Sequence, residues 1–252
     1  MDNLEITNIS LVFASILVFI SLFISYKEKL SLEKEIIIAI VRAIIQLSII
    51  GYILKYIFEV DNNILTLLIL VFMITNASLN ANKRGEGIKN SFKISFIAIS
   101  IGSLTTLSVL LLTKSLKFIP SQIVPVGGMV ISNAMVAMGL SYKTMLQSFK
   151  DRSAAVETKL SLGASIYIAS KDIIKDSIKT GMTPTIDRAK TLGIVSLPGM
   201  MSGLILAGVS PLYAIKYQIM VTFMLMSTTS IAAFISCYLA YKGFFNERKQ
   251  LI

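Results

Sequence analysis

The chain has 252 residues, of which 54% are hydrophobic and 15% charged, and its formal net charge is +10. Because soluble domains carry about 25% charged residues, this composition excludes an ordinary soluble domain. The positive charge excludes little by itself, but the Lys and Arg residues lie mainly in alternate loops between long apolar runs, which is typical of membrane topology and not of a nucleic-acid-binding protein.

Seven apolar segments follow one another along the chain, and most are about 20 residues long. A helix rises 1.5 Å per residue, so such a segment crosses a hydrocarbon core of ~30 Å. Lipid offers no partner to an unpaired backbone N–H or C=O, so the segments must be helical. We predict an all-α polytopic membrane protein that forms one transmembrane domain over residues 1–252, with spans at about 5–25, 36–58, 64–80, 92–113, 120–140, 192–208 and 212–241.

The basic residues predict the orientation of these spans. They are concentrated in loop 26–35, in the loop after the third span, in segment 141–190 and in the C-terminal tail, and they are sparse in the other loops. Cytoplasmic loops carry the excess of Lys and Arg in membrane proteins. We therefore expect an outside N-terminus and a cytoplasmic C-terminus in a multi-pass protein of the plasma membrane (the cell inner membrane).

Segment 141–190 is the longest stretch between spans, and its pattern predicts a cytoplasmic helix hairpin. Apolar residues at helical spacing indicate two helices, the first running through Met145, Phe149 and Val156. Gly163 is placed to end the first helix and Ser165 to cap the second.

No sequence motif gives this chain its own ATPase. A phosphate-binding G-x-x-x-x-G-K-[ST] loop is missing, and with no His and one Cys (Cys237) neither an internal disulfide nor a His- or Cys-based metal cluster is available. However, the run VETKLSLGAS (156–165) places Glu157 six residues before Gly163. This spacing resembles the cytoplasmic E-A-A-x-x-x-G loop of ABC permeases, although Thr158 and Lys159 replace the alanines. A solvated helix hairpin is the alternative interpretation.

Four longer stretches are more specific. They are MVISNAMVAMGL (129–140), TGMTPTID (180–187), GIVSLPGMMSG (193–203) and PLYAIKYQ (211–218). With them the chain closely resembles the FetB-type family of ABC permeases, which includes bacterial iron exporters and plant aluminium-tolerance permeases.

This resemblance implies a seven-span permease that acts in metal export or metal stress. It implies a separate ATP-binding subunit that holds ATP and Mg, while this chain binds no cofactor. Two permease chains would form a homodimer, since ABC transporters have two membrane halves. The contact with the ATPase would be made by Arg152, Glu157, Lys159, Gly163 and Ser165.

Residues that could line a translocation path are polar or helix-breaking and lie within predicted spans. Each has a simpler alternative, such as snorkelling of Arg42, a helix–helix hydrogen bond from an Asn, or a kink at Pro198 that serves packing. Pro125, Gly127 and Gly128 together would interrupt the fifth span. The candidates are Arg42, Gln46, Asn76, Gly128, Asn133, Ser196 and Pro198.

Gly199, Gly203 and Ala207 form a small-xxx-small pattern that favours close helix packing. The metal ligands, if any, are unknown. Iron prefers carboxylate, imidazole or thiolate ligands, and of these the spans offer only Cys237. An iron cargo would travel as a chelate, or the metal effect would be indirect.

Two other function classes fit the same features. An ATP-independent channel or carrier would work without an ATPase, and a membrane scaffold or sensor would recruit a soluble partner through segment 141–190 without transport.

Overall fold

The computed structural model describes residues 8–251 and divides the chain into two units. The described part of the first unit holds α1 (Asn8–Ala14), α2 (Ile16–Lys27) and α3 (Glu33–Val60). Residues 9–27 have the length and hydropathy of one span, as does α3, so the first two predicted spans are helical. The predicted start of the first span at residue 5 lies outside the described residues.

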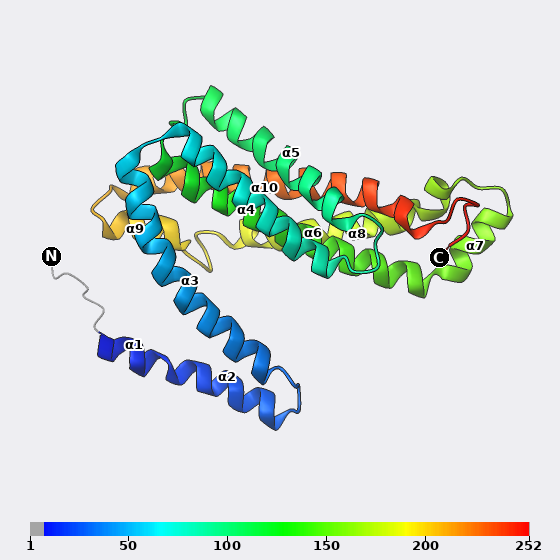
Figure 1. The fold of residues 1–252 in the computed structure, drawn as a ribbon, viewed down its shortest axis with the longest axis horizontal. Helices are drawn as coiled ribbons and strands as arrows, with labels where there is room; N and C mark the ends of the chain where they lie inside the picture. Colours follow the sequence, from blue (N-terminus) through cyan, green and yellow to red (C-terminus); the bar gives the residue numbers. More distant parts are fainter. Residues whose placement is uncertain (1–7, 252) are drawn as a thin grey trace. The chain divides into compact units, whose positions relative to one another are not determined.

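The second unit holds the other helices (Figure 1). They are α4 (Asn63–Arg84), α5 (Ser91–Leu112), α6 (Pro120–Asp151), α7 (Ser153–Ser161), α8 (Ile166–Thr191), α9 (Gly199–Leu206), α10 (Pro211–Ala240) and the 3₁₀ helix η1 (Tyr241–Phe244). Over the described residues no named strand is present, so the predicted all-α class is confirmed.

Six helices of the described chain, and not seven, have the length and composition of a membrane span. The segment 192–208, which we predicted as a span, is not one continuous helix, because residues 192–198 form a turn and α9 has only 8 residues. Such a helix is about 12 Å long, too short to cross a bilayer. Gly193, with φ +79°, and Pro198 at the N-cap of α9 explain the break, and Pro198 begins a helix here instead of kinking one.

The helices of segment 141–190 differ from the expected hairpin in their bounds and in their packing. Met145 and Phe149 belong to α6, which continues to Asp151, and α8 packs back along α6 and also against α10. A Cβ atom on Gly181 would overlap Ser141 Oγ and lie 2.7 Å from the carbonyl oxygen of Ala137, so glycine permits this close approach. The later part of α8 therefore lies beside residues of the predicted fifth span, and segment 141–190 is not wholly a loop outside the membrane.

α6 is the central helix of the second unit. It packs against α4, α5, α8 and α10, and α4 with α5, α5 with α10 and α10 with α8 are also in contact. Buried hydrogen bonds cross this bundle from Thr106 to Thr228 (2.7 Å between hydroxyl oxygens) and from Ser95 to Tyr142 (3.1 Å). Four helices of this unit therefore pack against α6.

The expected interruption of the fifth span is also wrong, because α6 is one helix through Pro125. The neighbouring glycines instead make room for α4. A Cβ atom on Gly127 would lie 2.5 Å from Leu70 Cδ2, and one on Gly128 would lie 2.9 Å from Met73 Cε.

Candidate functional site

The short helix α7 lies at one end of the second unit, near the C-terminus (Figure 1). It follows α6 after the single residue Arg152, and the turn 162–165 leads from it into α8. Gly163 ends α7 with φ +86°, and the Ser165 hydroxyl accepts a hydrogen bond from the Ile168 amide at 3.3 Å. The helix end and the N-cap predicted at these two residues are confirmed.

Two ion pairs hold α7 against α8. Arg152 Nη1 lies 2.9 Å from Asp176 Oδ2, and Lys159 Nζ lies 3.0 Å from Asp172 Oδ2. Asp172 and Asp176 are one helical turn apart and so lie on the same face of α8. Between the pairs Val156 is buried in the hydrophobic core. α7 is thus attached by charge at both ends and by apolar packing in its middle.

The charge of Lys159 stabilises the ionised form of Asp172. The hydrogen bond from Lys159 and then its positive charge lower the pKa of Asp172 below its ordinary value. Both side chains are substantially exposed, so the pair positions α7 more than it stabilises the fold.

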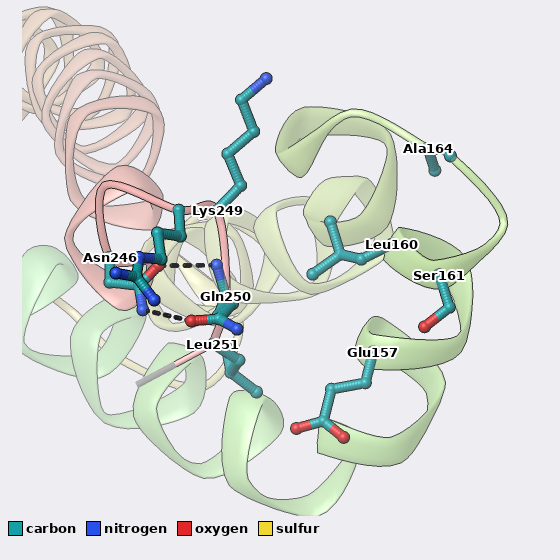
Figure 2. Close-up of a pocket in the computed structure, with 10 residues that line it drawn as sticks. Glu157, Leu160, Ser161, Ala164, Asn246, Lys249, Gln250 and Leu251 are labelled. Carbon is teal, nitrogen blue, oxygen red and sulfur yellow. Dashed lines mark hydrogen bonds between the residues drawn. The ribbon is translucent and has the colours of Figure 1, made fainter.

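A groove of about 790 Å³ separates α7 from the C-terminal tail. The tail forms a tight hairpin, in which the Asn246 side chain accepts from the Gln250 amide and donates to its side chain, both at 2.9 Å. Figure 2 shows Glu157 and Leu160 directed from α7 toward this hairpin. Arg248 and Lys249 line the opposite side, so the groove has an acidic and a basic wall.

The structure therefore brings the five predicted coupling residues to one end of the bundle. Arg152 and Lys159 are in ion pairs, Gly163 and Ser165 shape the turn, and the exposed Glu157 lines the groove. What they contact outside this chain stays a prediction.

Three of the seven predicted path residues lie on α4 and α6. Asn80 donates to both the carbonyl and the side-chain oxygen of Asn76, at 2.9 and 3.0 Å. Gly128 faces α4, and Asn133 donates to the Met129 carbonyl at 2.8 Å. Asn76 is thus hydrogen-bonded within its own helix. Asn133 also accepts a hydrogen bond from Arg188 of α8 at 3.3 Å, so the helix–helix bond that was its simpler alternative is present.

The other path residues are dispersed. Arg42 and Gln46 are exposed residues of α3 in the first unit. The Ser196 carbonyl accepts from the Gly193 amide at 3.0 Å in the turn before α9. Pro198 lines a cavity of about 340 Å³ that also contains Gln218, whose buried side-chain oxygen has no hydrogen-bond partner among the described residues.

The small residues of α9 are unpacked within the described chain. A Cβ atom on Gly199 or Gly203 would have no described atom within 4 Å beyond its own helix and its chain neighbours. Their predicted role in helix packing, together with Ala207, therefore stays a prediction.

Two arginines at the α4–α6 and α6–α8 contacts were missed by sequence reasoning. Arg188 Nη1 donates to Asn133 Oδ1 at 3.3 Å, and the side chain of Arg84 packs over Gly139. The distribution of basic residues along the sequence assigns both to loops that set the topology. The helical phase of Gly181 and Arg188, which are seven residues apart on α8, could have placed Arg188 toward α6.

No group of three or more His, Cys, Asp or Glu residues that could hold a metal ion occurs in residues 8–251. The described donor set therefore does not provide a conventional metal centre.

Comparisons with known proteins agree on one family. The model of an uncharacterised protein family, UPF0014, matches residues 8–245. The chain is 53% identical over its whole length to 97% of a protein of Escherichia coli (strain K12) named probable iron export permease protein FetB. It is 36% identical over 94% of its length to 84% of the UPF0014 membrane protein STAR2 of Oryza sativa subsp. japonica. It is 34% identical over 94% of its length to 87% of the protein ALUMINUM SENSITIVE 3 of Arabidopsis thaliana. No solved structure matches the chain.

Proposed function

Because the chain belongs to the UPF0014 family of multi-pass membrane proteins, we propose that it is the permease subunit of an ABC transporter in the plasma membrane. It exports iron or another metal species, using ATP hydrolysed with Mg on a separate subunit. The E. coli relative, which is named a probable iron export permease, supports the cargo and the direction. Two copies of the chain form the membrane part.

The single observation that carries the ATPase contact is the position of α7. It is a short helix at the end of the bundle. Its exposed residue Glu157 and the exposed Leu162 directly after its end leave it available to a soluble subunit. The groove between α7 and the C-terminal hairpin offers a concave surface of mixed charge beside it. We assign this end to the ATP-binding subunit.

The chain connectivity provides a route for the movement. Arg152 is both the only residue between α6 and α7 and the partner of Asp176 on α8. A displacement of α7 by the ATP-binding subunit is therefore passed directly to α6 and α8. These two helices pack along each other through the bundle, so they move together and switch access across the membrane.

The test is reconstitution of the protein into liposomes with its candidate ATP-binding subunit. We expect the two to co-purify and a metal species to stimulate ATP hydrolysis and to be transported. Transport without the ATP-binding subunit would favour a channel or carrier. Stable binding of the subunit with no ATP hydrolysis and no transport would favour a scaffold or sensor.

Charge reversal tests the docking surface. Glu157→Arg should lower co-purification of the ATP-binding subunit and ATP-dependent transport. The matched control is Glu247→Arg, which makes the same change on the C-terminal hairpin at a residue that does not line the groove. Equal effects of both variants, or none from Glu157→Arg, would remove the assignment of this groove.

A further inference from the structure

One side of α6 is left uncovered by its neighbours within the second unit. Going around α6, the described helices α4, α5, α10 and α8 pack against one another in that order, but α8 and α4 do not pack together to close the ring. On this side Ser132, Val136 and Lys143 of α6 are exposed. Their spacing of four and seven residues places them along one stripe of the helix.

Polar side chains flank this stripe on both sides. On α4, Met73 faces Gly128 of α6 and Arg84 packs over Gly139. Asn76 and Asn80 are exposed and lie between them at intervals of three and four residues, so they share that face of α4. On α8, Arg188 reaches Asn133 of α6. We call Asn76, Asn80, Arg84, Asn133 and Arg188 the polar face.

Other outward surfaces of the unit have a different character. Ile97, Ile101 and Leu104 of α5 are 45%, 43% and 57% exposed and are all apolar. Such a surface suits lipid, whereas exposed amides and guanidinium groups do not. The second unit therefore has an apolar side and a polar side.

Part of the polar face lies deep along the spans: Arg188 contacts Asn133 in the interior of α6, whereas Arg84 is the last residue of α4. Asn133 is 13 residues from the start of α6 at Pro120, which corresponds to about 20 Å along the helix axis. Charged residues at such depth normally face a partner charge or a water-filled cavity. Within residues 8–251 neither Arg84 nor Arg188 forms an ion pair, whereas the nearby Lys190 and Asp187 pair with each other at 3.2 Å.

We propose that the polar face lines the translocation path and binds an anion, so that the cargo is a metal held in a negatively charged polycarboxylate complex. This inference rests on the proposed function and specifies its substrate class. Guanidinium groups bind carboxylates with two parallel hydrogen bonds, and amide groups add further donors. The polar face itself contains no carboxylate, imidazole or thiolate with which to hold a bare metal ion.

The two arginines form successive positions along the path. Gly139, which Arg84 covers, is six residues from Asn133, which Arg188 contacts, so they differ by about 9 Å along α6. Arg84 is closer to the α7 end. A multivalent anion that enters there meets Arg84 first and Arg188 second.

Binding is measured on the purified permease without any ATP-binding subunit, so that this test stays separate from that of the proposed function. The probes are ferric citrate, citrate alone, free ferrous iron and inorganic phosphate. The binding of each probe is measured by equilibrium dialysis. We expect ferric citrate and citrate to bind and free iron not to bind. Binding of free iron, or of phosphate in preference to citrate, would overturn the proposal.

Variants locate the site. Arg188→Gln and Arg84→Gln should each weaken citrate binding about tenfold or more. Arg188→Lys keeps the charge and should therefore lose less citrate affinity than Arg188→Gln. Lys171→Gln, an exposed position of α8 near its start, removes one charge away from the polar face and should bind citrate normally. Unchanged binding in well-folded Arg188→Gln and Arg84→Gln would refute the site.

Exposure to water is tested by single cysteines in membranes. With Cys237 replaced by Ala, Ser132→Cys should react with a membrane-impermeant thiol reagent, and added ferric citrate should slow the reaction. Ile101→Cys on the apolar side of α5 is the matched control and should stay unmodified. If Ser132→Cys is as unreactive as Ile101→Cys, the polar face is not part of a water-filled path.

Discussion

Lys159 of α7 donates a hydrogen bond to Asp172 of α8 at 3.0 Å and thereby attaches the end of the short helix to the longer one. A second ion pair between the same elements joins Asp176 of α8 to Arg152, the residue that connects α6 to α7. The same side chains that occupy the proposed ATPase contact thus determine how firmly that contact is held to the membrane helices.

The attachment of α7 should depend on pH through Asp172. Lys159 lowers the pKa of Asp172, so the pair contributes above the unfolded pKa of this carboxyl and is lost as pH falls through its lowered folded value. We expect amide protection of residues 153–161 to be constant from neutral pH to about pH 5 and to fall in more acidic buffer. Hydrogen exchange, corrected for intrinsic rates, measures this.

Asp172→Asn removes the charge of this side chain at every pH. The amides of residues 153–161 should therefore show at pH 7 the low protection that the parent protein shows only in acidic buffer. Asp187→Asn is the control, because its partner Lys190 lies at the other end of α8. Protection of α7 that is identical in Asp172→Asn and Asp187→Asn would show that the pair does not hold the helix.

Gly163 should be sensitive to backbone conformation and not to side-chain volume. Its φ is +86°, and a Cβ atom there would have nothing within 4 Å. Gly163→Val places a β-branched residue in the left-handed region, at a cost of about 1–3 kcal/mol, and should redirect the turn into α8. We expect a membrane-inserted protein with uncoupled transport. Gly163→Asn should retain most of the coupling, since Asn tolerates the left-handed region. If Gly163→Asn and Gly163→Val lose coupling equally, side-chain bulk and not backbone conformation is responsible.

Gly181 should be sensitive to volume. Gly181→Ala brings a methyl group into Ser141 Oγ and the Ala137 carbonyl, so α8 must shift from α6, and overpacking costs about 1–3 kcal/mol. Thermal unfolding in detergent should register this loss. The double variant Gly181→Ala with Ser141→Ala removes the overlap with Ser141 Oγ and should recover part of the lost thermal stability. A single variant as stable as the parent protein would mean that the α6–α8 contact is looser than described.

The hydroxyl pair between Thr106 and Thr228 should stabilise the contact of α5 with α10. Thr228→Val keeps the shape but removes the 2.7 Å hydrogen bond with Thr106, together with the bond that the Thr228 hydroxyl donates to the Met224 carbonyl at 2.9 Å. We expect the bond between the helices to account for a loss of about 0.6–1.7 kcal/mol. Thr228→Ser retains the hydroxyl and is the matched comparison. If Val at this position is the more stable of the two, packing and not the hydrogen bond governs this contact.

The sequence was most informative where local chemistry decides the structure. Long apolar runs predicted the helices, and Gly163 and Ser165 predicted the turn after α7, because a glycine C-cap and a serine N-cap act within a few residues. Family resemblance, which is independent of that chemistry, agreed with the comparisons.

The errors arose where distant packing overrides local pattern. Hydropathy favoured a span at 192–208 and a loop at 141–190, whereas a polar helix packs along α6 because Gly181 fits beside Ser141. A pairing between residues 40 apart leaves no periodic signal in either segment. A count of basic residues likewise assigns Arg84 and Arg188 to loops, because it does not show which basic side chains pack between helices.

The unpacked face of α9 should become important only when two chains associate. Gly199 and Gly203 are four residues apart and so lie on one face, where an added Cβ would meet no described atom outside the helix itself. Gly203→Ile should therefore leave the thermal stability of the monomer in detergent unchanged but weaken any homodimer that uses this face, because a bulky side chain prevents close approach. Cross-linking in membranes and the mass of the detergent complex measure the oligomer, and Leu206→Ala, which removes bulk from an exposed position of the same helix, is the control. A homodimer that persists in Gly203→Ile would place the subunit contact elsewhere, whereas a destabilised monomer would show that α9 packs within its own chain.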